Sequence, residues 1–378
     1  MKKLLVFVFL IALAGNYANA GENLKLSVSE DYKYDSNIYK VASGRTSSLI
    51  RVTRGMAQYN TVLPNTPFKL NSGAMFGYNA YNKYSNTNNS IDSLISLGLN
   101  SPNMEFGEKF LFTSDAANNA DDDREKRWKN TISASFKTKK AHRLWLKATL
   151  ADSVDEYVNL NSMDRNTLSL SLRGYYSHSE KTDMYVGYKF TNITYQDNGK
   201  QNSGTHAISA GMEGRIAPKV TGDFDVFYSY RDYHKSANGY KDSKALLGLS
   251  LGLKYEMTER TFFNFDASRQ TEETVANNAN KNRYFVDTSF SVTANHKLSS
   301  RSTASLKIGW DNLDYDTKAN GQSKARNDNL YVIRPSFSHK INTVLSGSAF
   351  VEYKTRHSNL NNKGYDLFTA GIGMRALF

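Results

Sequence analysis

Apolar and polar side chains alternate with a period of two along most of this chain. Near the C-terminus Phe368, Ile372 and Met374 fall on one face of an extended segment, while Thr369 and Gly371 fall on the other. Such alternation predicts a β-strand with one apolar face and one polar face. After residue 20 no apolar run is long enough to cross a membrane as a helix. The pattern therefore predicts an all-β protein.

The alternation recurs to the last residue and predicts eighteen strands. An even count allows an antiparallel barrel to close with both termini on the same side of a membrane. Sixteen strands are the alternative count. The predicted strands cover residues 23–35, 48–59, 67–84, 89–100, 103–114, 126–138, 142–153, 164–175, 182–195, 205–217, 220–233, 243–255, 260–271, 283–297, 302–314, 327–340, 343–355 and 364–378.

The connections between the predicted strands alternate between short and long. Residues 101–103 and 217–219 belong to the short set, and residues 115–125 and 196–204 belong to the long, polar set. Short periplasmic turns and longer outer loops are typical of bacterial outer-membrane barrels. Because even the long connections have modest length, none is predicted to fold inward and narrow the barrel. Pro335 falls inside a predicted strand, where a β-bulge is expected.

The first twenty residues have the features of a secretory signal peptide. Two lysines precede an apolar stretch over residues 4–14, and residues 18–20 (Ala-Asn-Ala) supply a small-x-small cleavage site. The apolar stretch is too short to span a bilayer as a helix. We therefore expect residues 1–20 to be cleaved after Sec-type export, and residues 21–378 to form one transmembrane β-barrel. A first strand at residue 23 leaves no room for a plug domain before it.

The composition favours a membrane barrel over a soluble β-protein. The chain has no Cys, 24 Tyr and 20 Phe, and it is polar on average. Only one face of each barrel strand meets lipid, so a polar average is compatible with a membrane-spanning barrel. In the alternative, a secreted β-sandwich, the Gly, Ser, Thr, Asn and Lys of the second face could not fill a core. We predict a single antiparallel up-and-down β-barrel in the outer membrane of a Gram-negative bacterium.

The sequence contains no group of residues arranged for catalysis. Its seven histidines are not spaced as metal ligands, and no His-x-Ser pair of the outer-membrane phospholipase type is present. The acidic run over residues 121–123 is interpreted as part of a solvated loop. We therefore expect no catalytic, cofactor-binding or metal-binding residues, no cofactor and no enzymatic activity.

The chain is basic, with 48 Lys and Arg against 36 Asp and Glu, and has a net charge of +12. If the apolar faces meet lipid, basic residues outnumber acidic residues on the face turned to the lumen. Pairing across neighbouring strands would neutralise this wall, whereas an unpaired excess would favour anions. The sequence is compatible with both interpretations. The candidate lumen-lining basic residues are Arg127, Lys129, Arg143, Lys147, Arg173, Lys189, Lys254, Lys307 and Arg375.

Two short segments resemble features of known outer-membrane barrels. The first predicted strand ends in Tyr-Asp-Ser-Asn-Ile-Tyr, residues 34–39, and this resembles the putative β-barrel porin type 2 group. Members of that group and related barrels often accompany exopolysaccharide export systems. The resemblance implies a porin-like or polysaccharide-passing barrel and implies no catalytic residues. The terminal Phe378 resembles the signal that delivers such barrels to the barrel-assembly machinery.

These features predict a channel for passive passage of small hydrophilic or anionic solutes. One alternative is a conduit that exports an acidic exopolysaccharide, whose carboxylates would follow the lumen lysines and arginines. A second alternative is a non-conducting structural or adhesive barrel. The expected partners are outer-membrane lipids and lipopolysaccharide, the barrel-assembly machinery, and the solute or polysaccharide. Nucleic acid is not expected, because export removes the chain from it.

Overall fold

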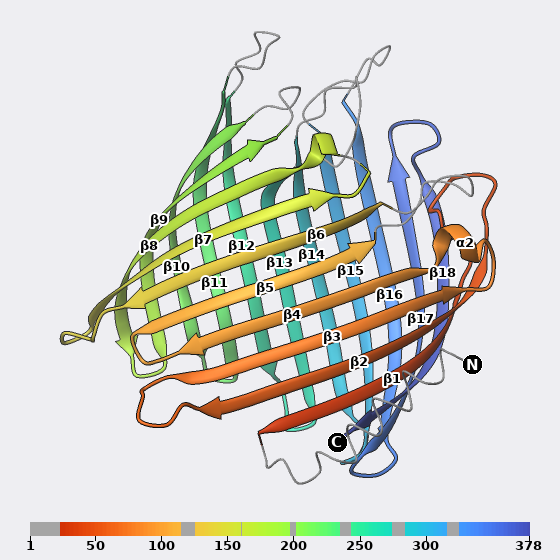
Figure 1. The fold of residues 1–378 in the computed structure, drawn as a ribbon, viewed down its shortest axis with the longest axis horizontal. Coiled ribbons are helices and arrows are strands. Elements are labelled where there is room, and N and C mark those ends of the chain that lie inside the picture. Colours follow the sequence, from red (N-terminus) through yellow and green to blue (C-terminus); the bar gives the residue numbers. More distant parts are fainter. Residues whose placement is uncertain are drawn as a thin grey trace.

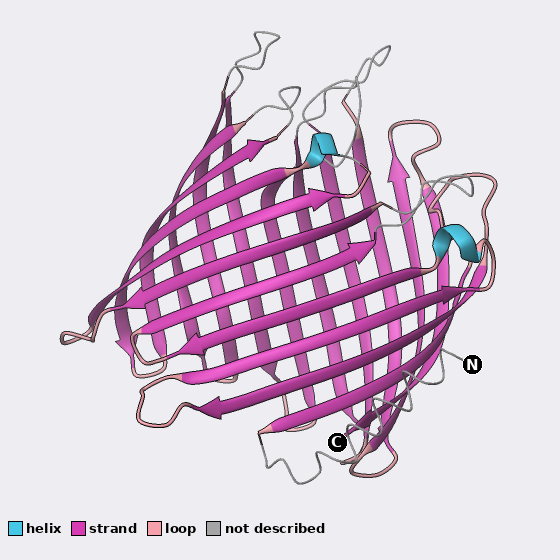
Figure 2. Ribbon diagram, in the orientation of Figure 1, coloured by secondary structure: helices cyan, strands magenta, loops and turns pink. Residues whose placement is uncertain are grey.

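Strands make up nearly all of the described chain. In the computed structural model the described residues are 23–114, 125–159, 161–196, 202–234, 243–273, 284–315 and 325–378. Within these ranges the remaining regular elements are α2 (Ser85–Asn88) and the 3-10 turn η1 (Asn161–Met163) (Figure 2). No helix among the described residues has the length and apolar character needed to span a membrane.

Eighteen antiparallel strands form one closed sheet, in which each strand pairs with its neighbours in the sequence (Figure 1). This confirms the predicted fold class and the count of eighteen, and it excludes sixteen. The strands are β1 (Leu24–Asp35), β2 (Ser48–Val62), β3 (Lys69–Tyr81), β4 (Ser90–Asn100), β5 (Met104–Ser114), β6 (Lys126–Lys137), β7 (Leu144–Tyr157), β8 (Arg165–Ser179), β9 (Thr182–Tyr195), β10 (Ser203–Ala217), β11 (Val220–Tyr233), β12 (Ser243–Glu256), β13 (Thr261–Glu273), β14 (Tyr284–Lys297), β15 (Ser302–Tyr315), β16 (Asn327–Lys340), β17 (Leu345–Ser358) and β18 (Tyr365–Leu377).

The barrel closes where the first strand meets the last. Strands β1 and β18 pair from Ser27↔Leu377 to Asp35↔Thr369. Backbone hydrogen bonds between Leu26 and Phe378, of 3.0 and 2.8 Å, extend this seam to the final residue. Closure satisfies the backbone groups that an open sheet edge would leave unpaired, which is a requirement for a sheet that spans lipid.

The two faces of the wall differ as the alternation predicts. On β12 the side chain of Leu247 is 64% exposed on the outside, whereas that of Leu246 is 6% exposed on the inside. On β18, Ile372 points outward and Leu367 points inward in the same way. Gly248 on the inner face leaves room for the ring of Phe227 on β11, since a Cβ there would lie 2.1 Å from a ring carbon. Apolar side chains thus cover the outer surface of the wall, where a bilayer would contact it.

Pro335 sits in β16 without a bulge, so the predicted bulge is wrong. Its pairing with Leu306 of β15 is retained. Toward β17 the pairs Ile333↔Tyr353 and Ser336↔Phe350 belong to one unbroken register. The proline therefore occupies a regular strand position, and only the pairing toward β17 is interrupted beside it.

Candidate functional site

The candidate site is the inner face of the barrel. An antiparallel barrel of eighteen strands is wide enough to hold an aqueous channel unless loops or side chains fill it. Eight of the nine basic residues predicted from the alternation lie at inward-facing strand positions. They are Arg127 and Lys129 on β6, Lys147 on β7, Arg173 on β8, Lys189 on β9, Lys254 on β12, Lys307 on β15 and Arg375 on β18.

Arg143, the ninth predicted residue, lies outside this wall. It occupies the turn before β7 and follows His142, whose φ is 59°. The Arg143 guanidinium donates to the hydroxyl of Tyr176 over 3.3 Å, and the Tyr176 ring stands on the outer face of β8. The prediction failed because the strand was expected to begin at residue 142, whereas the turn extends to residue 143.

Many of the inward-facing cations are neutralised by carboxylates. Glu105 on β5 contacts both the Lys137 ammonium, at 2.5 Å, and the Lys147 ammonium, at 3.4 Å. Arg334 lies 3.5 Å from Glu352 across β16 and β17. These contacts correspond to the interpretation of a wall rigidified by cross-strand pairs.

Two further carboxylates near the loop end of the wall are almost fully buried. The Asp155 side chain is 2% exposed and lies 3.4 Å from Arg127 and 3.2 Å from Arg165. The Asp328 side chain is fully buried between Arg326 and Arg356. The sequence analysis missed both acids as lumen residues, although each shares the parity of inward-facing neighbours.

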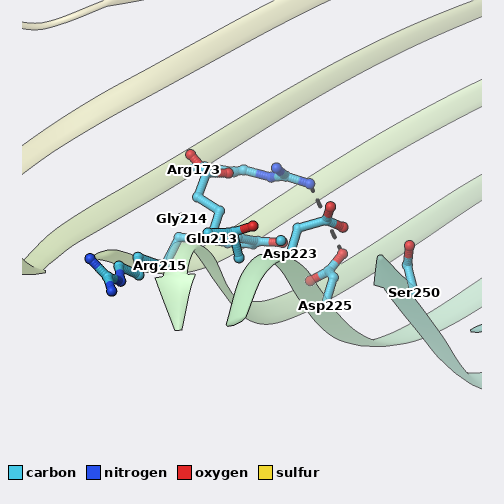
Figure 3. Close-up of a pocket in the computed structure, with 10 residues that line it drawn as sticks. Arg173, Glu213, Gly214, Arg215, Asp223, Asp225 and Ser250 are labelled. Carbon is cyan, nitrogen blue, oxygen red and sulfur yellow. Dashed lines mark ion pairs between the residues drawn. The ribbon is translucent and has the colours of Figure 1, made fainter. Parts of the chain in front are cut away.

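A hollow of about 670 Å³ lies on the inner wall near the short-turn end, around Arg173. The Arg173 guanidinium reaches from β8 to within 4.0 Å of Asp225 on β11, while Arg215 points away from this pair (Figure 3). The guanidinium also lies over the ring of Tyr185, 4.4 Å from its centroid. Glu213 pairs in register with Asp223, so two carboxylates adjoin on the same face. This part of the wall therefore presents charges of both signs.

The first loop, residues 36–47, folds into the barrel. Its Ile38 and Tyr39 pack against Ile50 and Val52, which face the lumen from β2. The Tyr39 hydroxyl accepts a hydrogen bond of 2.9 Å from the side-chain amide of Asn88 on α2. The expectation that no connection would fold inward is therefore wrong. Its sequence signal was the apolar Ile38-Tyr39 pair inside a polar connection.

Asn37 anchors this loop to both strands of the barrel seam. Its side chain is fully buried, and its amide nitrogen donates to the carbonyl oxygens of Val41, at 2.8 Å, and Asp366, at 3.1 Å. Its side-chain oxygen accepts from the Val41 backbone at 3.2 Å, and its own backbone amide donates to Asp35 at 2.9 Å. The loop is thus attached to β1 and β18 by a connected set of hydrogen bonds.

Besides the first loop, a second feature narrows the lumen at the place where β12 and β13 separate. Their pairing runs from Glu256↔Phe262 to Leu249↔Arg269 and stops there. Beyond that point β12 continues to Ser243 against β11, and β13 continues against β14. The end of β13 and the start of β14 therefore form a hairpin that no longer follows the wall.

The aromatic contacts show that this hairpin leans into the lumen. Tyr284 on β14 has the same strand parity as the outward-facing Phe290, yet it is buried. Its ring stacks on that of Tyr233, with centroids 5.8 Å apart, and Tyr233 faces the lumen from β11. The outer face of β14 can touch the inner face of β11, three strands away, only if the hairpin lies inside β11.

Phe378 lies at the seam, at the end of the barrel where the short turns are found. Its backbone is bonded to Leu26, and its ring is exposed on the outside. Among the described residues no group of three or more His, Asp or Glu side chains could hold a metal ion.

Comparison with known proteins gives the family of the chain. A sequence model of the family described as Putative beta-barrel porin 2 matches residues 126–378, well over half of the chain. The chain belongs to this family. No curated protein matches this porin by sequence. The match begins at β6, so the inward-folded first loop lies outside the matched residues.

Solved porin structures share the fold of this porin. The outer membrane protein OpdK from Pseudomonas aeruginosa is 8% identical with a TM-score of 0.53, over 94% of this chain and 100% of that chain. A BenF-like porin from Pseudomonas fluorescens Pf-5 is 9% identical with a TM-score of 0.54, over 94% and 98% of the two chains. OccK2 (OpdF) from Pseudomonas aeruginosa is 8% identical with a TM-score of 0.54, over 94% and 97%. At such identities the likeness is one of fold alone.

Proposed function

We propose that this porin is an outer-membrane channel for passive passage of small hydrophilic solutes, with a preference for anions. The observation that carries the proposal is the closed eighteen-stranded wall, whose outer face is apolar and whose inner face is polar and charged. Family membership and the fold shared with outer-membrane porins support it.

The preference for anions rests on cations of the inner wall that lack a carboxylate. Within the described ranges Lys129, Lys189 and Lys307 face the lumen and make no ion pair. Pairing has neutralised other cations, such as Arg127 and Lys147, so these three stand out as inward-facing cations without a carboxylate partner. Fixed positive charge in a confined aqueous path raises the local concentration of anions.

The narrowed loop end of the lumen favours small solutes over a polymer. The first loop occupies the inner face of β2, and the hairpin of β13 and β14 crosses the inner face of β11. A chain of sugars would have to pass both obstacles in an extended form. We therefore place export of an acidic exopolysaccharide second.

Liposome swelling tests the solute class. Vesicles that contain the purified, folded porin are diluted into isosmotic glucose or sodium glucuronate, which have similar ring sizes. We expect faster swelling in glucuronate, and heat-denatured porin serves as the control. Equal rates would contradict the anion preference, and no swelling in either solute would favour the structural barrel. Slow entry of the monomer together with tight block by glucuronate oligomers would favour the export conduit.

A further inference from the structure

Lys40 stands at the apex of the inward-folded first loop. Its backbone amide donates to the carbonyl oxygen of Asn37 over 3.0 Å, and its φ of 54° places it in the left-handed region. A lysine in that conformation costs free energy relative to glycine. Asn37, Ile38 and Tyr39 beside it are buried, whereas the Lys40 side chain is exposed. The loop therefore holds one cationic side chain in the solvent of the lumen.

Basic residues from two strands surround Lys40. Asn37, whose carbonyl oxygen accepts from the Lys40 amide, is bonded to the carbonyl of Asp366, the neighbour of Leu367, which pairs in register with Lys354 of β17. The charges of Lys33 and Asp35 of β1 and of Lys354 and Arg356 of β17 act on Lys40 at this place. All four side chains face the lumen, because they share the parity of Asp31 and Glu352 on their strands. The loop apex thus approaches the inner wall where β17, β18 and β1 meet.

Within this basic cluster, two of the cations are neutralised. The Lys33 ammonium lies 3.9 Å from the Asp35 carboxylate. The Arg356 guanidinium lies 3.8 Å from the buried carboxylate of Asp328.

Lys40 and Lys354 are the remaining cations of the cluster. In the part of the chain that the structure describes, neither of them makes an ion pair. Desolvation by the surrounding barrel interior lowers the pKa of Lys40, and the charge of Lys354 lowers it further, whereas Asp35 acts in the opposite direction. Two neighbouring like charges repel each other, and an anion between them removes this repulsion.

We propose that Lys40 and Lys354 form a subsite at the loop end of the lumen that binds an anionic oxygen group, carboxylate or phosphate, of a passing solute. The subsite rests on the proposed channel function and deepens it, since it assigns the selection of anionic solutes to one loop residue and one wall residue. The rigid anchoring of the loop by Asn37 makes this a fixed filter.

Reversal potentials in a KCl gradient test the subsite. The variants are Lys40→Glu, Lys354→Glu and the double variant. The control is Lys254→Glu, which makes the same charge change at an inner-wall lysine whose charge Glu256 already neutralises. At low ionic strength, where screening is weak, we expect each single variant to lower the chloride-to-potassium permeability ratio about threefold. The double variant should reverse the preference. Lys254→Glu should have a clearly smaller effect.

Block of the chloride current distinguishes the ligand and provides a second readout. Succinate and inorganic phosphate are titrated separately against wild-type porin and against Lys40→Gln/Lys354→Gln. We expect the double Gln variant to bind the effective blocker about tenfold more weakly, which corresponds to about 1.4 kcal/mol. Block by succinate alone would identify a carboxylate site, and block by phosphate alone a phosphate site.

The outcomes separate this inference from the channel function. A wild-type porin that passes no current would refute the channel function itself. A conducting porin whose selectivity and block are the same in wild type and in the Lys40 and Lys354 variants would overturn the subsite alone. A shift equal to that of Lys254→Glu would also overturn it, because the effect would then reflect general lumen charge. Folding of each variant is checked by heat-modifiable migration on a gel.

Discussion

Near the loop end of the wall, two buried carboxylates each lie between two arginines. Asp155 forms ion pairs with Arg127 and Arg165, and Asp328 forms ion pairs with Arg326 and Arg356. Removing one partner from such a cluster leaves the others uncompensated, which costs more than the cluster contributes when complete. We therefore expect these acids to matter for stability, whereas the proposed function assigns permeation to the unpaired lumen lysines.

Asp155→Ala is expected to destabilise the barrel by about 3 kcal/mol, because two arginines lose their counter-charge. The measurement is urea unfolding in detergent, followed by tryptophan fluorescence. Glu256→Ala is the matched control, since Glu256 pairs with Lys254 at an exposed position and its loss should leave the midpoint unchanged. Equal midpoints for both variants would refute the role assigned to Asp155.

The lowered pKa of Lys40 predicts a dependence of selectivity on pH. Lys40 is charged below its pKa, so its attraction for anions is present at lower pH and is lost as pH rises through that lowered pKa. The groups that face it are Lys33, Asp35, Lys354 and Arg356. Anion selectivity of the wild type should therefore decline at a less alkaline pH than that of Lys40→Arg. Identical pH profiles of the reversal potential would count against this.

For single residues, the sequence predicted which face a side chain points to better than it predicted which residues that side chain contacts. Strand parity placed Lys129, Lys189 and Lys307 inward, because side chains alternate whatever the neighbouring strands contain. It could not place Asp155, which lies beyond the predicted strand end at residue 153. It also misplaced Arg143, because a boundary error of one residue moves a side chain from wall to turn.

Two elements depart from a plain barrel, the first loop and the hairpin of β13 and β14. Both are held by contacts between residues far apart in the chain, such as Asn37 with Asp366 and Tyr233 with Tyr284. Alternation along a strand is a local pattern and could be read from the sequence. These long-range contacts depend on which strands become neighbours, so the sequence pattern alone did not reveal them.

Asn37→Ala removes the side-chain bonds that hold the first loop to the seam. We expect larger and noisier single-channel currents, because a released loop no longer occupies a fixed position in the lumen. Ser43→Ala changes an exposed residue of the same loop and should leave the currents as in wild type. Quiet, wild-type currents from Asn37→Ala would show that the loop is held by other contacts.

The separation of β12 and β13 can be tested with introduced disulfides, since the chain has no Cys. Leu249→Cys with Arg269→Cys joins the last registered pair and should oxidise readily. Leu247→Cys with Thr271→Cys would face each other only if the pairing continued. We expect this second pair to stay reduced in folded protein. Equal oxidation of both pairs, seen as a gel shift, would contradict the inward-leaning hairpin.

At the scale of the whole molecule, one closed wall separates an apolar outside from a charged inside. The fold class and strand count were predicted from the sequence because every strand repeats the same binary pattern. The width of the open path was not, because it depends on the loop and the hairpin that enter the lumen. The wall and these two obstacles together are the basis of the proposed channel for small solutes.

Planar-bilayer recording of the purified wild-type porin tests this conclusion most directly. Stepwise insertions should give ohmic currents. In a KCl gradient their reversal potential should lie nearer to the equilibrium potential of chloride than to that of potassium. A folded, heat-modifiable protein that inserts without current, or one whose reversal potential lies on the side of potassium, would contradict the account.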